Sequence, residues 1–288
     1  MTDQGHQDSG PQNTGPWGRR DGRDAAVVAS PSGASTAPAP EQPRSKGRVT
    51  LILSTLLMVG FLWFLTQSWV IAVSLMFALF VHEYGHVLAM NRLGMGPARI
   101  YVIPFLGGLA KATHEPKNEW VGVLVSLAGP AFGLLAMVPL VAVGLATGDG
   151  QWMAAAFFVA MLNLINLVPA PPLDGSKALG PVLARVHPQL EKLVLLAIGV
   201  AVVWWGITTG RYILAVFLGL AIWGHLSKGG LRSIRGPLSW KQAAMSLGLF
   251  VLTAVACGGA AMASLLAMNG GSGQASVDMI ARYLGINL

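Results

Sequence analysis

The chain has 288 residues, of which 53% are hydrophobic and only 11% are charged, and its formal net charge is +7. A soluble domain carries about a quarter charged residues, so this composition indicates a membrane protein. One cysteine excludes a disulfide scaffold within the chain. The basic balance would favour a nucleic-acid partner in a soluble protein, but in a membrane protein cations also mark the cytoplasmic loops.

The N-terminal segment differs in composition from the rest of the chain. Residues 1–48 are rich in Gly, Pro, Ser, Asp and Arg and contain almost no large apolar side chains. Such a segment buries too little apolar surface to offset the entropy lost on ordering, so we expect a disordered tail. Residues 49–268 are expected to form the membrane domain, and residues 269–288 a short C-terminal tail.

Apolar runs follow one another through the membrane domain. About 20 apolar residues cross a bilayer as a helix, and the runs predict spans at 49–66, 70–90, 120–146, 151–168, 190–208, 212–226 and 243–268. The run at 212–226 is short, so six crossings remain an alternative to seven. The expected fold is therefore an all-α polytopic membrane protein with six to seven transmembrane helices.

The cations gather on one side of this arrangement. If the tail is cytoplasmic, 17 of the 19 Lys and Arg residues lie on the cytoplasmic side, and Arg211 and Arg282 lie on the other. Short cytoplasmic loops carry the excess of Lys and Arg in membrane proteins. We therefore expect a multi-pass protein of the inner (cell) membrane with a cytoplasmic N-terminus. The lipid bilayer then accounts for the basic charge, and no nucleic-acid partner is expected.

Three polar residues interrupt the second apolar run: His82, Glu83 and His86 form an H-E-x-x-H motif. A charged side chain at the bilayer centre costs about 2.5 to 3.5 kcal/mol, so such residues usually have a partner or a task. On a helix, residues four apart share a face, and both imidazoles can bind one ion. Glu83 lies beside the first of them, where its carboxylate can take a proton from an activated water. A chance motif would leave all three groups without a partner in hydrocarbon.

A zinc site with two histidines needs a third protein ligand. The other histidines lie in the tail, in hydrophilic loops or at the end of a span (His6, His114, His187 and His225). Asp174 remains, and its expected depth fits. His86 and His82 lie roughly 9 and 15 Å from the cytoplasmic end of their helix, and prolines at 169, 171 and 172 break the span that begins at 151 before it crosses.

These residues resemble the site-2 proteases, the intramembrane zinc metalloproteases of peptidase family M50. The resemblance rests on H-E-x-x-H at 82–86 and on N-x-x-P-x-P-x-x-D-G at 166–175. It implies one Zn²⁺ per chain held by His82, His86 and Asp174, with Glu83 as general base. It also implies that Asn166 holds the substrate or the developing oxyanion. The alternative for Asn166 is an amide that caps broken backbone near the prolines.

Two further stretches are similar to the family. Gly107 and Gly108 lie in the loop after the histidine helix, where relatives fold a membrane-re-entrant β-hairpin that is thought to hold an unwound substrate as an added strand. The resemblance implies that both glycines contact substrate, and a flexible loop is the alternative. Residues 128–130 resemble the start of a G-P-x-x-N element, but Gly133 stands where the asparagine is expected. The family core is expected at 70–179, in a minimal form without a PDZ or CBS domain.

The implied activity is the hydrolysis of peptide bonds within or near transmembrane segments, that is, regulated intramembrane proteolysis with the active site toward the cytoplasmic side. The implied partner is a single-span membrane protein such as an anti-sigma factor or a signal-peptide remnant. One alternative is a metal transporter or membrane metal-binding protein, which would be expected to carry further ligands on the outer half of its spans; the sequence has none there. Another alternative is a catalytically silent relative that acts as a binding module.

Overall fold

The computed structural model describes residues 44–103, 107–210 and 237–272, together with residues 212, 215, 216, 219, 220, 223 and 278. The predicted tail before residue 44, the loop residues 104–106, most of the predicted span at 212–226 and most of the C-terminal tail lie outside the described residues. The structure does not test the predictions made for those residues.

The described part is mostly helical. Its helices are α1 (Arg44–Thr66), α2 (Trp69–Arg92), α3 (Glu119–Leu135), α4 (Met137–Thr147), α5 (Gly150–Asn166), α6 (Asp174–Val186), α7 (Pro188–Thr208) and α9 (Trp240–Met268). Between α2 and α3, the strands β1 (Arg99–Ile103) and β2 (Gly107–Lys111) form an antiparallel hairpin. The prediction of a mostly helical protein with a short hairpin after the histidine helix is confirmed.

Among the described residues, five helical segments are long and apolar enough to cross a membrane: Val49–Thr66, Trp69–Arg92, Glu119–Thr147, Gln189–Thr208 and Trp240–Met268. The run predicted at 151–168 corresponds to the shorter apolar helix α5, which ends at Asn166. Helix α1 begins at Arg44, within the segment that the sequence assigned to the tail. The count of six to seven crossings and the re-entrant placement of the hairpin stay predictions.

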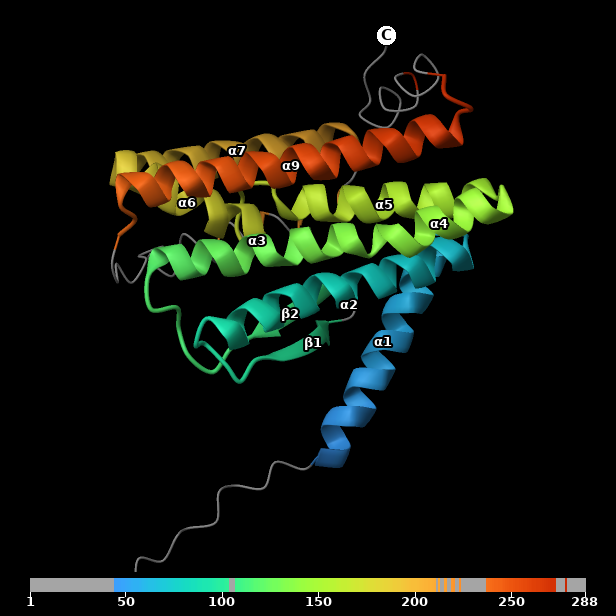
Figure 1. Cartoon of the computed structure of the whole chain (residues 1–288), viewed down its shortest axis with the longest axis horizontal. Coiled ribbons are helices and arrows are strands. Elements are labelled where there is room, and N and C mark those ends of the chain that lie inside the picture. Colours follow the sequence, from blue (N-terminus) through green and yellow to red (C-terminus); the bar gives the residue numbers. More distant parts are fainter. Residues whose placement is uncertain are drawn as a thin grey trace, which may run out of the picture. The chain divides into compact units, whose positions relative to one another are not determined.

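Helix α2 lies at the centre of the arrangement that forms the site. It packs on α3 and α5, α5 packs in turn on α9, and these four helices run alongside one another (Figure 1). The core between them contains many small side chains, and Ala78 of α2 lies in one apolar cluster with Ala155, Ala156 and Ala160 of α5. Small residues let helix backbones approach closely, which is how membrane helices pack without a hydrophobic driving force between them. Buried polar side chains on α2 are thereby brought close to α3 and α5.

The end of α5 and the start of α6 follow from the prolines between them. Proline has no backbone N–H to donate and clashes with the preceding turn, so α5 ends at Asn166, before Pro169. Residues 167–173 form turns, and α6 begins at Asp174. Since α6 packs on α3, these turns place the first residue of α6 beside the histidines of α2.

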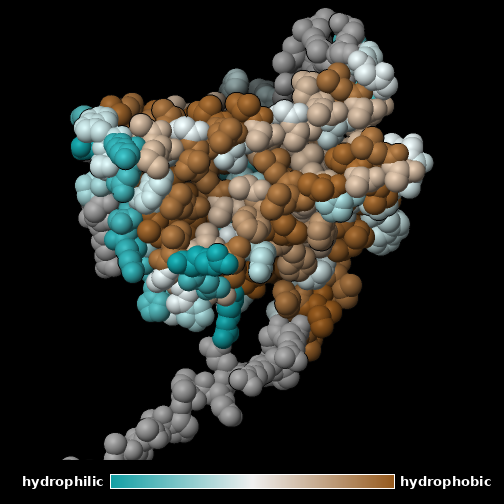
Figure 2. All heavy atoms as spheres, viewed as in Figure 1, coloured by the Kyte–Doolittle hydropathy of each residue, from teal (hydrophilic) through white to brown (hydrophobic). Residues whose placement is uncertain are grey.

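The surface has the distribution of polarity of a membrane protein. Large apolar side chains are exposed along several helices, among them Phe64, Trp204 and Leu252. Figure 2 shows apolar residues over most of the visible face, and hydrophilic residues gathered at the end where α2 ends and α3 and α9 begin. Helix α1 contacts α2 and β1, and much of its remaining surface is apolar and exposed.

Candidate metal centre and active site

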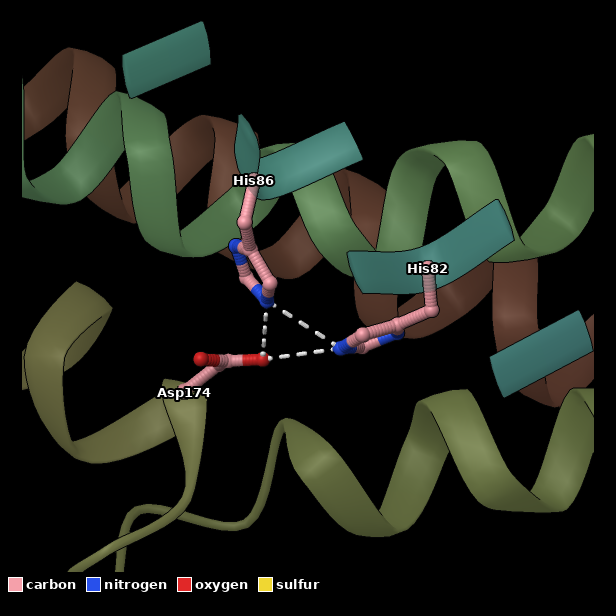
Figure 3. A group of neighbouring side chains, drawn as sticks. All are labelled: His82, His86 and Asp174. Carbon is pink, nitrogen blue, oxygen red and sulfur yellow. Dashed lines mark hydrogen bonds and ion pairs between the residues drawn. The ribbon is translucent and has the colours of Figure 1, made fainter. Parts of the chain in front are cut away.

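Three ligand-type side chains converge between α2 and α6. His82 and His86 lie one turn apart on α2, and both rings point toward the Asp174 carboxylate at the start of α6 (Figure 3). Oδ2 of Asp174 lies 3.2 Å from Nε2 of His82 and 3.1 Å from Nε2 of His86, and the two Nε2 atoms are 3.2 Å apart. All three residues are buried, with 2%, 6% and 8% of their surface exposed for His82, His86 and Asp174.

The far nitrogen of each ring fixes which atom faces the cluster. Nδ1 of His86 lies 2.8 Å from the backbone carbonyl of Val125, and Nδ1 of His82 lies 2.9 Å from the side-chain oxygen of Asn163. Both oxygens accept hydrogen bonds, so each Nδ1 is the donor and carries the proton of the neutral ring. The two Nε2 lone pairs and the carboxylate oxygen therefore face one another. A cation that lay among these three atoms would be bound by all of them.

The donor set and its dimensions fit zinc. Tetrahedral zinc holds imidazole nitrogen at about 2.0 to 2.1 Å, which separates its ligand atoms by about 3.3 to 3.4 Å. The three separations in the cluster are 3.1, 3.2 and 3.2 Å. Two histidines and one carboxylate leave a fourth position open, as in catalytic rather than structural zinc sites. The sequence-predicted ligands are thus brought together in a geometry that could hold one zinc ion.

Gly129 of α3 leaves space beside the two imidazoles. A Cβ atom on Gly129 would overlap Nε2 of His86 and would lie 2.8 Å from Nε2 of His82. Those are the two nitrogens that face the carboxylate of Asp174. Position 129 therefore tolerates no side chain if an ion is to lie among these atoms.

Glu83 is held against the hairpin. It is buried beside the two histidines of α2, and the backbone N–H of Ala110 in β2 donates to its carboxylate. Gly108 lies directly against this side chain, since a Cβ on Gly108 would overlap Glu83. The sequence predicted that Gly108 contacts substrate; the structure shows a contact with Glu83. Gly107, with φ of 117°, begins the same strand.

A cavity of about 570 Å³ opens onto this group. Glu83, Asn166 and Gly108 line it together with the three ligand-type residues, so of the predicted site residues only Gly107 is not among its lining residues. Asn166 is the last residue of α5, and its amide nitrogen donates to the carbonyl of Leu162 at 3.0 Å. This bond joins two residues of α5, in a side chain that also borders the cavity, so the substrate-holding role and the alternative of a cap on the broken backbone near the prolines both stay predictions.

Sequence reasoning missed Asn163. This asparagine is fully buried in α5 and bonds directly to His82. Its one signal in the sequence is an amide in an otherwise apolar run, three residues before the N-x-x-P motif.

If the site binds zinc and hydrolyses peptides, as the sequence resemblance implies, Gly108→Ala should lower hydrolysis strongly while leaving zinc content unchanged. The added methyl group would displace the Glu83 side chain. The three atoms nearest to that methyl group all belong to Glu83 and not to a ligand-type residue. Metal analysis and a cleavage assay on the same preparation measure the two effects. Gly60→Ala is the matched control, because a Cβ there meets nothing within 4 Å. Equal activity of both variants would contradict the placement of Glu83 against β2.

Comparison with known proteins finds one matching family and relatives that are named zinc metalloproteases. The model of "Peptidase family M50" matches residues 70–151. A protein of Synechocystis sp. named "Putative zinc metalloprotease sll0528" is 32% identical over 138 residues, which cover 45% of this chain and 36% of that protein. "Zinc metalloprotease MJ0392" of Methanocaldococcus jannaschii is 27% identical over 157 residues, covering 52% of this chain and 45% of that one.

A third relative is "Putative zinc metalloprotease Rip3" of Mycobacterium tuberculosis, 28% identical over 157 residues, with 45% of this chain and 38% of the relative covered. The chain thus spans less than half the length of each of these relatives. No solved structure matches the chain at a significant level.

Proposed function

We propose that the chain, whose residues 70–151 match the model of peptidase family M50, is an intramembrane zinc metalloprotease that hydrolyses peptide bonds within or near transmembrane segments of other membrane proteins. One observation carries the proposal. The ligand-type triad and Glu83 are buried together at the wall of one cavity, and His82, Glu83 and His86 lie on an apolar helix long enough to cross a membrane. A zinc site that served structure alone would need neither the open fourth position nor the adjacent carboxylate.

The proposed mechanism divides the work among the residues of the site. His82, His86 and Asp174 would hold the ion, whose Lewis acidity activates a water molecule and polarises the scissile carbonyl. The Glu83 carboxylate accepts the proton of the attacking water and passes it to the nitrogen of the leaving segment. Asn166, at the cavity wall, is assigned to hydrogen bonding with the substrate backbone. Burial of the group excludes bulk water, which strengthens each of these electrostatic interactions.

The proposed substrate is a single-span membrane protein, such as an anti-sigma factor or the remnant of a signal peptide. A peptide bond must leave its helix before it can be attacked, and a strand edge pairs with the freed backbone groups. Strand β2 borders the cavity through Gly108, Leu109 and Ala110, which supports this mode of binding. We further propose that the protein lies in the cell membrane with a cytoplasmic N-terminus and with the site toward the cytoplasm, as the distribution of cations favours.

Removal of the metal tests the proposal. The purified protein, reconstituted in liposomes, is incubated with a panel of single-span transmembrane peptides before chelation, after chelation and after zinc is restored. We expect cleavage to be lost with the metal and regained with it. Loss of a residue that only supports a ligand lowers metal affinity by up to about 100-fold. Asp174→Ala removes one of the three ligands themselves, so the zinc affinity of this variant should fall by more than that. Mass spectrometry of the products and metal analysis measure these effects.

A zinc-flux assay on the same liposomes separates the transport alternative. Zinc uptake without cleavage of any peptide would overturn the proposed hydrolysis. Zinc binding with neither cleavage nor flux would instead favour a silent, ligand-binding relative.

A further inference from the structure

The buried amide of Asn163 is bonded at both ends. Its nitrogen donates to the Val159 carbonyl of its own helix at 2.8 Å, and its oxygen lies 2.9 Å from Nδ1 of His82. A carbonyl can only accept, so the bond to Val159 fixes the nitrogen on the helix side and turns the oxygen toward the histidine. Asn163 therefore imposes a proton on Nδ1 of His82 and leaves Nε2 free to bind a cation.

The two histidines differ in what holds them. His86 bonds to the backbone carbonyl of Val125, a group present whatever side chain occupies that position. His82 depends on the side chain of a residue 81 positions away, on another helix. A substitution at position 163 can therefore remove the hydrogen bond that orients His82, whereas a substitution at position 125 leaves the bond to His86 in place.

Gly133 of α3 makes room for this amide. A Cβ atom on Gly133 would overlap the side-chain amide of Asn163, so the two helices approach there only because position 133 has no side chain. Position 133 is also where the G-P-x-x-N pattern calls for an asparagine, which this chain lacks. An asparagine on α3 and an asparagine at 163 would compete for the same space beside His82.

We propose that Asn163 is the positioning residue of His82, and that in this chain α5 supplies, across Gly133, an amide that the sequence pattern would supply from α3. The inference rests on the proposed zinc site. It makes Asn163 and Gly133 a coupled pair. An amide at position 163 can orient His82 when position 133 has no side chain, and an amide at position 133 can do so when position 163 has only a small one.

Zinc affinity of the purified full chain tests this, measured by competition with a chelator and accompanied by thermal melting of the metal-free form. Asn163→Leu removes the acceptor at similar volume and should weaken zinc binding by about 10- to 100-fold, the usual cost of losing a partner that orients a ligand. Asn163→Asp keeps an oxygen that accepts from Nδ1 and should bind zinc much more tightly than Asn163→Leu. Gln151→Leu, on the exposed first turn of α5, is the matched control and should bind as wild type.

The coupling has its own test. Gly133→Asn alone should weaken binding, because its side chain overlaps that of Asn163. Combined with Asn163→Ala, the same change should bind zinc more tightly than either single variant. Wild-type affinity in a folded Asn163→Leu protein would overturn the positioning role. If that variant does not fold, the proposal is overturned when the double variant Gly133→Asn with Asn163→Ala binds zinc no more tightly than either single variant. Absence of zinc binding in the wild type would instead refute the proposed function.

Discussion

Glu83→Gln is expected to slow peptide cleavage by several orders of magnitude while leaving the zinc content of the protein unchanged. The amide has the shape of the carboxylate but cannot accept the proton of the attacking water. General acid–base groups contribute about 10² to 10⁴ in rate, so the loss should fall in that range. None of the ligand-type atoms belongs to Glu83, so metal content should not change. Cleavage of a reporter peptide and metal analysis, made on the same reconstituted sample, give both numbers.

Glu191→Gln provides the control for this change. It makes the same substitution in the first turn of α7, away from the cavity lining, and should cleave at the wild-type rate. Comparing membrane proteomes of host cells that produce wild-type protein or Glu83→Gln should then reveal substrates as stabilised single-span fragments. Wild-type cleavage by Glu83→Gln would remove Glu83 from the reaction and would leave the proposed mechanism without a base.

Gly129→Ala is expected to prevent zinc binding and to abolish cleavage with it. The methyl group would overlap Nε2 of His86 and press on Nε2 of His82, the two atoms that face Asp174. Because the imidazoles are also fixed by Val125 and Asn163, they cannot turn aside without losing buried hydrogen bonds. Zinc content after dialysis against a zinc buffer measures the effect.

Gly248→Ala is its matched control, since it places the same methyl group in the long apolar helix α9, where a Cβ meets nothing within 4 Å. Both variants should fold. Retention of stoichiometric zinc by Gly129→Ala would mean that the ion lies elsewhere, and the assignment of the cluster would fail.

The ligand-type cluster was accessible to sequence reasoning because each step follows from helix geometry. The spacing of His82 and His86 fixes a shared face, and the prolines before Asp174 fix the level at which the chain unwinds. The structure brings these three side chains to within 3.2 Å of one another. Which roles they play in catalysis stays a prediction.

Asn163 could not be found in the same way. One amide in an apolar helix indicates a hydrogen bond with some neighbour, but the rotation of α5 about its axis decides which neighbour that is. This rotation follows from the packing of α5 against α2, α4 and α9. The sequence shows that Gly133 stands where the G-P-x-x-N element has an asparagine. That this glycine makes room for Asn163 follows only from the packing of α5.

Helix α6 is a second feature that could not be predicted from the sequence. The prolines at 169, 171 and 172 predict a broken span before Asp174, but they do not predict the helix that begins at that residue. Gly175, Gly180 and Pro181 all disfavour a helix by intrinsic propensity. Contacts with α3, α7 and α9 stabilise it instead, and such contacts cannot be summed from local sequence.

The three ligand-type atoms come from two segments, α2 and the start of α6, and His86 and Asp174 are 88 positions apart in the chain. Neither segment holds the full set alone, so an ion bound by all three ties the two segments together. Metal loading and assembly of the bundle are then a single equilibrium, in which free zinc stabilises the assembled chain by mass action. Newly inserted copies in a zinc-starved cell would therefore remain loosely assembled for longer and be exposed to quality-control proteolysis.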